Sequence, residues 1–165
     1  MDRNETLLDI FENLPIKAKC LVIEHNNFDI LEEIGMYDYK IFSPIELIFY
    51  ITFEIEKEIN NNFIYIQPQY DLEYKNKKYI ADFVIEYDEI TNNNLKEEFK
   101  LIIECDGYEF HQKTKKQVEY DNKREYDLKM MGYQILRFSG SEIYNNPKEC
   151  VKKVFKYIEE FGYDR

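Results

Sequence analysis

Apolar residues in the first third of the chain recur at the three- and four-residue spacing of a helix face, which predicts helices over residues 5–14 and 27–35. The clearest helix signal begins at Ser43. A serine, a proline at the first helical position and Glu46 together make up a capping-box sequence there. This helix should end near Ile59, before a run of asparagines. Because its residues are apolar almost all round, we expect it to be central and buried.

The middle of the chain carries shorter apolar runs bounded by turn residues, a pattern typical of β-strands. We predict strands over residues 63–70, 78–87 and 99–105, a turn at 75–78 and a longer polar loop at 87–98. Consecutive strands joined in this way favour an antiparallel meander.

The last third of the chain returns to helical spacing. A highly charged helix over residues 113–131 should end at Gly132, and a short strand over 133–138 follows. A turn at 139–142 leads into a last helix over 147–161. Because the short strand follows a helical crossover, we expect it to pair parallel to the strand before that helix. The order predicts an α/β fold, a mixed central β-sheet flanked by helices.

A length of 165 residues and an apolar content of 44% fit one globular domain. No apolar stretch approaches the roughly 20 residues that span a bilayer. The first residues lack the basic and apolar regions of a signal peptide, so we expect a cytoplasmic protein. Cys20, Cys105 and Cys150 show no metal or disulfide spacing, and we expect buried free thiols. With two histidines, a Cys/His zinc site is disfavoured.

The net charge of −11 argues against an open basic surface for nucleic acid. The charge is uneven, however. Residues 100–165 carry 13 Lys and Arg against 12 Asp and Glu, and residues 1–99 carry 9 against 21. A polyanionic partner should therefore meet the C-terminal half of the chain.

Glu104 and Asp106 lie one residue apart where the apolar run at 99–105 ends, and Gly107 follows. Alternate strand residues project to the same face, so the two carboxylates should project together. Two like charges repel unless a cation or a shared proton relieves them. Asp82 interrupts another apolar strand, and joint metal binding with Glu104 would give it a partner. The alternative is a strand edge with solvated acids.

Glu46, Asp82 and Glu104, with the backbone carbonyl of Cys105, offer oxygen ligands suited to Mg²⁺ or Mn²⁺. Such a metal lowers the pKa of a bound water and stabilises charge on a phosphoryl oxygen, as phosphodiester hydrolysis requires. Glu46 has the alternative role of capping its own helix. Asp106 either joins the site or holds the turn by accepting a hydrogen bond.

The charged helix directly follows this site. Lys113, Lys116 and Gln117 lie at its start, where they could orient the attacking water or contact the scissile phosphate. The alternative is a solvated helix with i,i+4 ion pairs. His111, just before it, is either a proton carrier or phosphate contact, or an anchor of the turn.

Gln117, Asp121, Arg124 and Leu128 share one face of the same helix. Arg137 lies in an apolar strand and needs a partner, for which Asp121, the site carboxylates and a phosphate are candidates.

The run from Ile102 to Pro147 resembles the PD-(D/E)XK nuclease superfamily, and within it a small bacterial branch that looks like very-short-patch-repair endonucleases. That branch has the pattern Glu-x-Asp-Gly, then a histidine, Asp-x-x-Arg, a glycine and an apolar-Arg-Phe strand. The matching positions are Glu104, Asp106, Gly107, His111, Asp121, Arg124, Gly132, Arg137 and Phe138. Upstream, residues 43–46 and 81–83 resemble the family's helix acid and strand acid.

The resemblance covers about residues 43–147 and implies a restriction-endonuclease-like core, which we expect over residues 43–165. Residues 1–42 match nothing in this superfamily, and we expect them to form a helical N-terminal cap of the same domain. The implied metal ligands are Glu46, Asp82 and Glu104, with the Cys105 carbonyl assisting. Asp106 stands where the superfamily usually has a lysine. The candidates for the missing water-positioning group are Lys113, Lys116 and Gln117.

The leading hypothesis is a Mg²⁺-dependent endonuclease that hydrolyses DNA phosphodiester bonds, for which the family chemistry implies a 5′-phosphate and a 3′-hydroxyl product. The phosphate-contact candidates are Lys113, Lys116, His111, Arg124 and Arg137. The alternative is a catalytically inactive nuclease-fold binding module, or a subunit of a defence or repair complex. DNA is the expected partner, since no RNA-binding motif is present. A homodimer and a larger nucleic-acid-processing complex both stay open.

Overall fold

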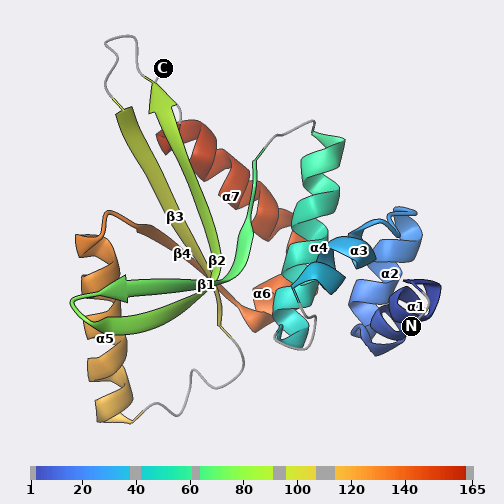
Figure 1. Ribbon diagram of the computed structural model, residues 1–165, viewed down its shortest axis with the longest axis horizontal. Helices are drawn as coiled ribbons and strands as arrows, with labels where there is room; N and C mark the ends of the chain where they lie inside the picture. The colour runs from blue at the N-terminus through green and yellow to red at the C-terminus, as the bar shows by residue number, and fades with distance from the viewer. Residues whose placement is uncertain (1–2, 38–41, 61–63, 91–95, 107–113, 163–165) are drawn as a thin grey trace. The chain divides into compact units, whose positions relative to one another are not determined.

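The computed structural model describes residues 3–37, 42–60, 64–90, 96–106 and 114–162. The elements in chain order are α1 (Arg3–Asn13), α2 (Ile16–Glu24), α3 (Ile30–Met36), α4 (Pro44–Ile59), β1 (Gln67–Tyr74), β2 (Lys77–Ile90), β3 (Lys96–Asp106), α5 (Lys115–Met130), β4 (Gln134–Ser139), α6 (Gly140–Asn145) and α7 (Pro147–Phe161). They form two compact units (Figure 1). The helical unit comprises residues 1–63 and 141–152, and the sheet unit comprises residues 64–140 and 153–165. The expected boundary near residue 42 stays a prediction.

The helical unit is organised around α4, whose start confirms the capping box. The Glu46 amide donates to the Ser43 hydroxyl at 3.3 Å, and the Ser43 amide donates to the Glu46 carboxylate at 3.3 Å. Every residue from Glu46 to Glu56 is buried, as the all-round apolar pattern predicted. Helix α2 had no counterpart in the sequence analysis. It buries Ala18 and Val22, and so small a buried face gives a weak periodic signal.

The sheet unit contains one four-stranded sheet in the order β1-β2-β3-β4. β1 pairs antiparallel with β2, and β2 pairs antiparallel with β3. β4 follows α5 and pairs parallel to β3, as the crossover argument predicted. This mixed sheet flanked by helices confirms the predicted α/β fold class.

The strand bounds differ from the expected ones at two places. β1 begins at Gln67, later than predicted. β2 runs as far as Ile90, and β3 begins already at Lys96. The polar loop expected at 87–98 is therefore mostly strand. Backbone pairing carries polar residues such as Asp88 and Glu98, whose side-chain types do not signal a strand. The β1–β2 hairpin turns at Lys75 and Asn76, with φ of 47° and 62°, the positive values of a type I′ turn.

Helix α5 packs on one face of the sheet (Figure 1). The buried cluster on that face is Leu72, Tyr79, Ala81, Val84, Ile102, Leu128 and Tyr133. Fully buried residues from alternate positions of β2 and β3 lie on the opposite face: Phe83, Ile85, Leu101 and Ile103. Gly132 has φ of 91° and ends α5, where the Tyr133 amide donates to the Leu128 carbonyl at 3.2 Å. Leu128 therefore marks the side of α5 that faces the sheet.

Two further expectations are corrected. The turn expected at 139–142 is the start of helix α6. Cys105 and Cys150 are buried, as expected, whereas Cys20 is exposed because it lies on the outer side of α2. No helix in the described ranges has both the length and the apolar character that a membrane span requires.

Candidate active site

Asp82 of β2 and Glu104 of β3 lie at the same end of the ladder that pairs the two strands. The last pair in the β2–β3 register is Phe83 with Ile103, so both acids lie one residue beyond it. There the Cys105 amide donates to Asp82 Oδ2 at 2.6 Å. The Asp82 carboxylate thus accepts a backbone hydrogen bond near the end of β3. This hydrogen bond holds Asp82 beside the segment of β3 that carries Glu104.

Glu104 is buried, and its charge is paired with Arg124 of α5. Arg124 Nη2 lies 2.7 Å from Glu104 Oε1, and the same nitrogen donates to the Ile80 carbonyl at 2.7 Å. Burial lowers the pKa of Arg124. The hydrogen bond to Glu104 and the negative charges of Glu104 and Asp82 outweigh burial and raise this pKa above its ordinary value. Both predicted ligands therefore act electrostatically on one cation.

Arg137 has a different ion-pair partner from those predicted. It faces Glu104 across the parallel β3–β4 pair, and its Nη1 lies 2.9 Å from Glu125 Oε2. Glu125 also accepts from Lys129 at 2.7 Å. The hydrogen bond from Lys129 and then the charge of Arg137 hold the pKa of Glu125 below its usual value. The partner is thus Glu125, four residues along the helix from the proposed Asp121.

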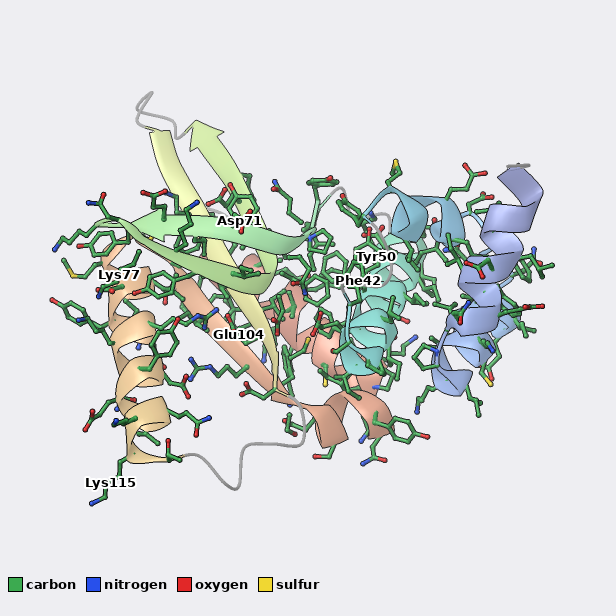
Figure 2. All side chains as sticks on the ribbon, turned by 60° about the horizontal axis from the view of Figure 1, so that its bottom comes forward. Phe42, Tyr50, Asp71, Lys77, Glu104 and Lys115 are labelled. Atoms are coloured by element: carbon green, nitrogen blue, oxygen red, sulfur yellow. The ribbon has the colours of Figure 1, made fainter. Side chains whose placement is uncertain are left out.

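A cavity of about 210 Å³ opens between the end of β3, β4 and α5. It is lined by Glu104, Asp106, Val118, Asp121, Asn122, Arg124 and Arg137. A water molecule occupies about 30 Å³ in the liquid, so the cavity has room for a phosphate group with several waters. Figure 2 shows Glu104 on the side of the sheet where α5 packs. The cavity combines carboxylates with two guanidinium groups, as an anionic substrate bound with a cation would require.

A comparison with protein families decides the wider assignment. The family model REase_MTES_1575 matches residues 53–158, more than half of the chain. The chain belongs to this restriction endonuclease-like family. No curated protein and no solved structure matches the chain. The match contains Asp82, Glu104, Arg124 and Arg137, and begins after Glu46.

Membership of the REase_MTES_1575 family leaves individual residue roles to be argued from the structure. Glu46 lies in the helical unit, where it caps α4; its Oε1 also accepts from the Ser43 hydroxyl at 2.6 Å. Gln117 caps α5, since its Oε1 accepts from the Thr114 amide at 2.8 Å, and Lys116 beside it is exposed. His111 and Lys113 lie outside the described residues.

The chemistry of the site fits a hard divalent cation. Within the described ranges, no group of three or more acidic, histidine or cysteine side chains is placed to hold a metal ion. Mg²⁺ differs from most metals in this respect, because it commonly uses one or two carboxylates and completes its shell with water and substrate phosphate. Asp82 and Glu104 are two carboxylates of the kind such a site would use.

Several features of the site escaped the sequence analysis. The Glu104–Arg124 ion pair joins two residues that the sequence assigned to different roles, metal ligand and phosphate contact. Val118 and Asn122 line the cavity without any motif to mark them. A partial signal for both was present, because Val118, Asp121, Asn122 and Glu125 stand at three- and four-residue spacing along one side of α5.

Proposed function

We propose that the protein is a metal-dependent endonuclease that hydrolyses DNA phosphodiester bonds. The observation that carries the proposal is the convergence of Asp82 and Glu104, from adjacent strands, on Arg124 beside a cavity. The Glu-x-Asp-Gly pattern at Glu104 supports placing the chain near very-short-patch-repair endonucleases within the restriction endonuclease-like families.

In this proposal Asp82 and Glu104 hold Mg²⁺, with the Cys105 carbonyl and Asp106 as further oxygen donors. When bound, the ion would polarise a phosphoryl oxygen and make a water more acidic. Arg124 and Arg137 bind the phosphate oxygens, since a guanidinium matches a phosphate with two donors. To bind a phosphate oxygen, Arg124 would replace part of its hydrogen bonding to Glu104 with a hydrogen bond to the substrate.

The group that positions the attacking water is proposed among residues before and at the start of α5. Lys116 is exposed there and keeps its ammonium available to a substrate. Gln117 would act only after leaving its cap on Thr114. His111 and Lys113 complete the set of candidates, and single substitutions of the four would identify the one whose loss lowers kcat alone.

The direct test is cleavage of supercoiled plasmid and of single-stranded circular DNA with Mg²⁺, Mn²⁺ or EDTA. Glu104→Gln and Asp82→Asn keep the size of each side chain and remove its charge. We expect metal-dependent nicking or linearisation by the wild type and none by either variant. Matched controls are Asp71→Asn and Glu73→Gln, exposed acids of β1 in the same sheet. Cleavage retained by either site variant would refute the assignment of that residue.

A binding module without turnover is the second candidate, favoured by one observation. In the structure both proposed ligands already have protein donors, Cys105 for Asp82 and Arg124 for Glu104. Calorimetric titration with Mn²⁺ separates the two candidates. A nuclease should bind the ion in a manner that depends on Asp82 and Glu104, and an inactive scaffold should give no such heat.

A further inference from the structure

A basic and aromatic surface lies on the sheet unit beside the cavity. It consists of Lys75 and Lys77 at the β1–β2 turn with Tyr120, Lys123 and Tyr126 of α5, and is called the hairpin surface below. All five side chains are exposed. Figure 2 shows Lys77 next to α5. The chain as a whole has a net charge of −11, so a local cluster of lysines is unusual for its surface.

One lysine of this surface pairs with a buried carboxylate, and a second lysine lies beside the first. Lys77 Nζ lies 3.5 Å from Asp127 Oδ2, and the Tyr79 hydroxyl donates to the same oxygen at 2.6 Å. Lys123 lies against Lys77, and this contact together with the charge of Lys77 lowers the pKa of Lys123. Two ammonium groups therefore face solvent around a single acid. A bound anion would relieve their repulsion.

The aromatic residues stand on either side of Lys123. Tyr120 precedes it by three residues and Tyr126 follows it by three, so the three side chains form one stripe along α5. The rings are 58% and 62% exposed, although tyrosine is on average intermediate in burial. Lysines that contact phosphates and exposed rings on which bases stack are the two elements of single-strand recognition. In a duplex the base faces are already stacked on one another.

The hairpin surface and the cavity are linked through Arg124. Arg124 follows Lys123 in the chain and joins the Ile80 carbonyl of β2 to Glu104 in the cavity wall. Ile80 is itself 56% exposed. Arg124, the residue after Lys123, therefore links the hairpin surface to the lining of the cavity.

We propose that the hairpin surface binds a single-stranded segment of nucleic acid, with its phosphates on Lys77 and Lys123 and its bases stacked on Tyr120 and Tyr126. This inference rests on the proposed function, because it names the form of substrate that the same cavity receives. It makes the enzyme selective for unpaired DNA next to the scissile bond.

Binding is measured by fluorescence anisotropy in EDTA, with full-length protein and a labelled oligothymidylate of about 16 nucleotides, a length within single-strand site sizes. We expect Lys77→Gln/Lys123→Gln to weaken binding and to reduce the salt slope of log K by about 1.4, at about 0.7 for each phosphate contact. Tyr120→Ser should weaken binding between about 5-fold and about 150-fold, while Tyr120→Phe should keep the affinity.

The controls match the variants in charge and ring loss. Lys152→Gln/Lys156→Gln removes two exposed lysines of α7, and Tyr144→Ser removes an exposed ring of α6. Because Lys77 also pairs with Asp127, Lys123→Gln alone repeats the test without removing that ion pair. Circular dichroism establishes that each variant is folded.

The possible results separate the two proposals. Equal affinity and salt slope for the wild type and the lysine variants would overturn the hairpin surface, and so would tighter binding of a duplex of the same length. Loss of binding in the variants of the hairpin surface alone would support it. The nuclease proposal is decided separately, by whether the wild type cleaves when Mg²⁺ is added.

Discussion

Arg124 joins helix α5 to two strands through a single nitrogen, which lies 2.7 Å from Glu104 Oε1 and 2.7 Å from the Ile80 carbonyl. The side chains of Arg124 and Glu104 are only 14% and 11% exposed. A pair so far out of water is sensitive to the loss of one partner, because the remaining charge stays buried. The same pair holds the proposed ligand and a proposed phosphate contact together until substrate arrives.

We predict that Arg124→Met lowers the free energy of unfolding by about 3 kcal/mol, because Glu104 would keep a buried charge without its cation. Lys129→Met is the matched control, since the Lys129 side chain is 60% exposed in its pair with Glu125. Its cost should be below about 1 kcal/mol. Urea unfolding at neutral pH measures both. Similar costs for the two variants would contradict a buried role for the Arg124 pair.

The double variant Glu104→Gln/Arg124→Met refines this prediction. It removes both charges, so it should be less destabilised than the sum of the single variants. A strictly additive result would mean that the two side chains do not interact in solution.

We predict that Asp82→Asn and Asp82→Ala differ in stability and agree in activity. The asparagine side-chain oxygen can still accept the hydrogen bond of the Cys105 amide, whereas alanine leaves that amide without its partner. Asp82→Ala should therefore cost about 1 kcal/mol more than Asp82→Asn in free energy of unfolding. Cleavage should be absent in both. An active Asp82→Asn would mean that the residue only caps the strand end.

Most of the fold could be predicted from local sequence because its signals are local. The capping box at Ser43 and Glu46 began α4 where expected, and Gly132 ended α5. The strand acids Asp82 and Glu104 were placed on neighbouring strands because Asp82 interrupts one apolar run and Glu104 lies where the next one ends. Such signals require no knowledge of what the element packs against.

Choices between similar partners could not be predicted in the same way. Arg137 pairs with Glu125, although Asp121 lies one helical turn earlier and carries the same charge. The outcome depends on how far α5 extends before Gly132 and on the register of β4 against β3, which only the assembled sheet fixes. Helix α2 was missed because it buries few residues, and the ends of β2 and β3 were missed because polar residues continue the ladder.

Asp127 should give a measurable pH dependence of stability. The hydrogen bond from the Tyr79 hydroxyl, followed by the charge of Lys77, holds the pKa of Asp127 below its usual value despite desolvation. A carboxyl whose pKa is lowered on folding stabilises the protein above its unfolded pKa of about 3.9, and that stabilisation is lost as pH falls through the folded value.

Asp127→Asn should therefore be less stable than the wild type at pH 7, and the difference should shrink toward pH 3. Urea midpoints across that range provide the measurement, with Asp71→Asn of β1 as the exposed control. A difference that stays constant with pH would contradict the role of the charge.

Ser43 and Glu46 allow the capping role to be separated from metal binding. Ser43→Ala removes the hydroxyl that accepts from the Glu46 amide, and we expect a loss of about 1 kcal/mol in free energy of unfolding. Glu46→Gln keeps an oxygen for the Ser43 amide, because glutamine serves equally at this position of a capping box, so its stability should stay close to that of the wild type.

A cap acts through hydrogen bonds, whereas Mg²⁺ prefers a charged carboxylate. We therefore expect Glu46→Gln to keep cleavage. Cleavage lost at unchanged stability would instead support Glu46 as a metal ligand.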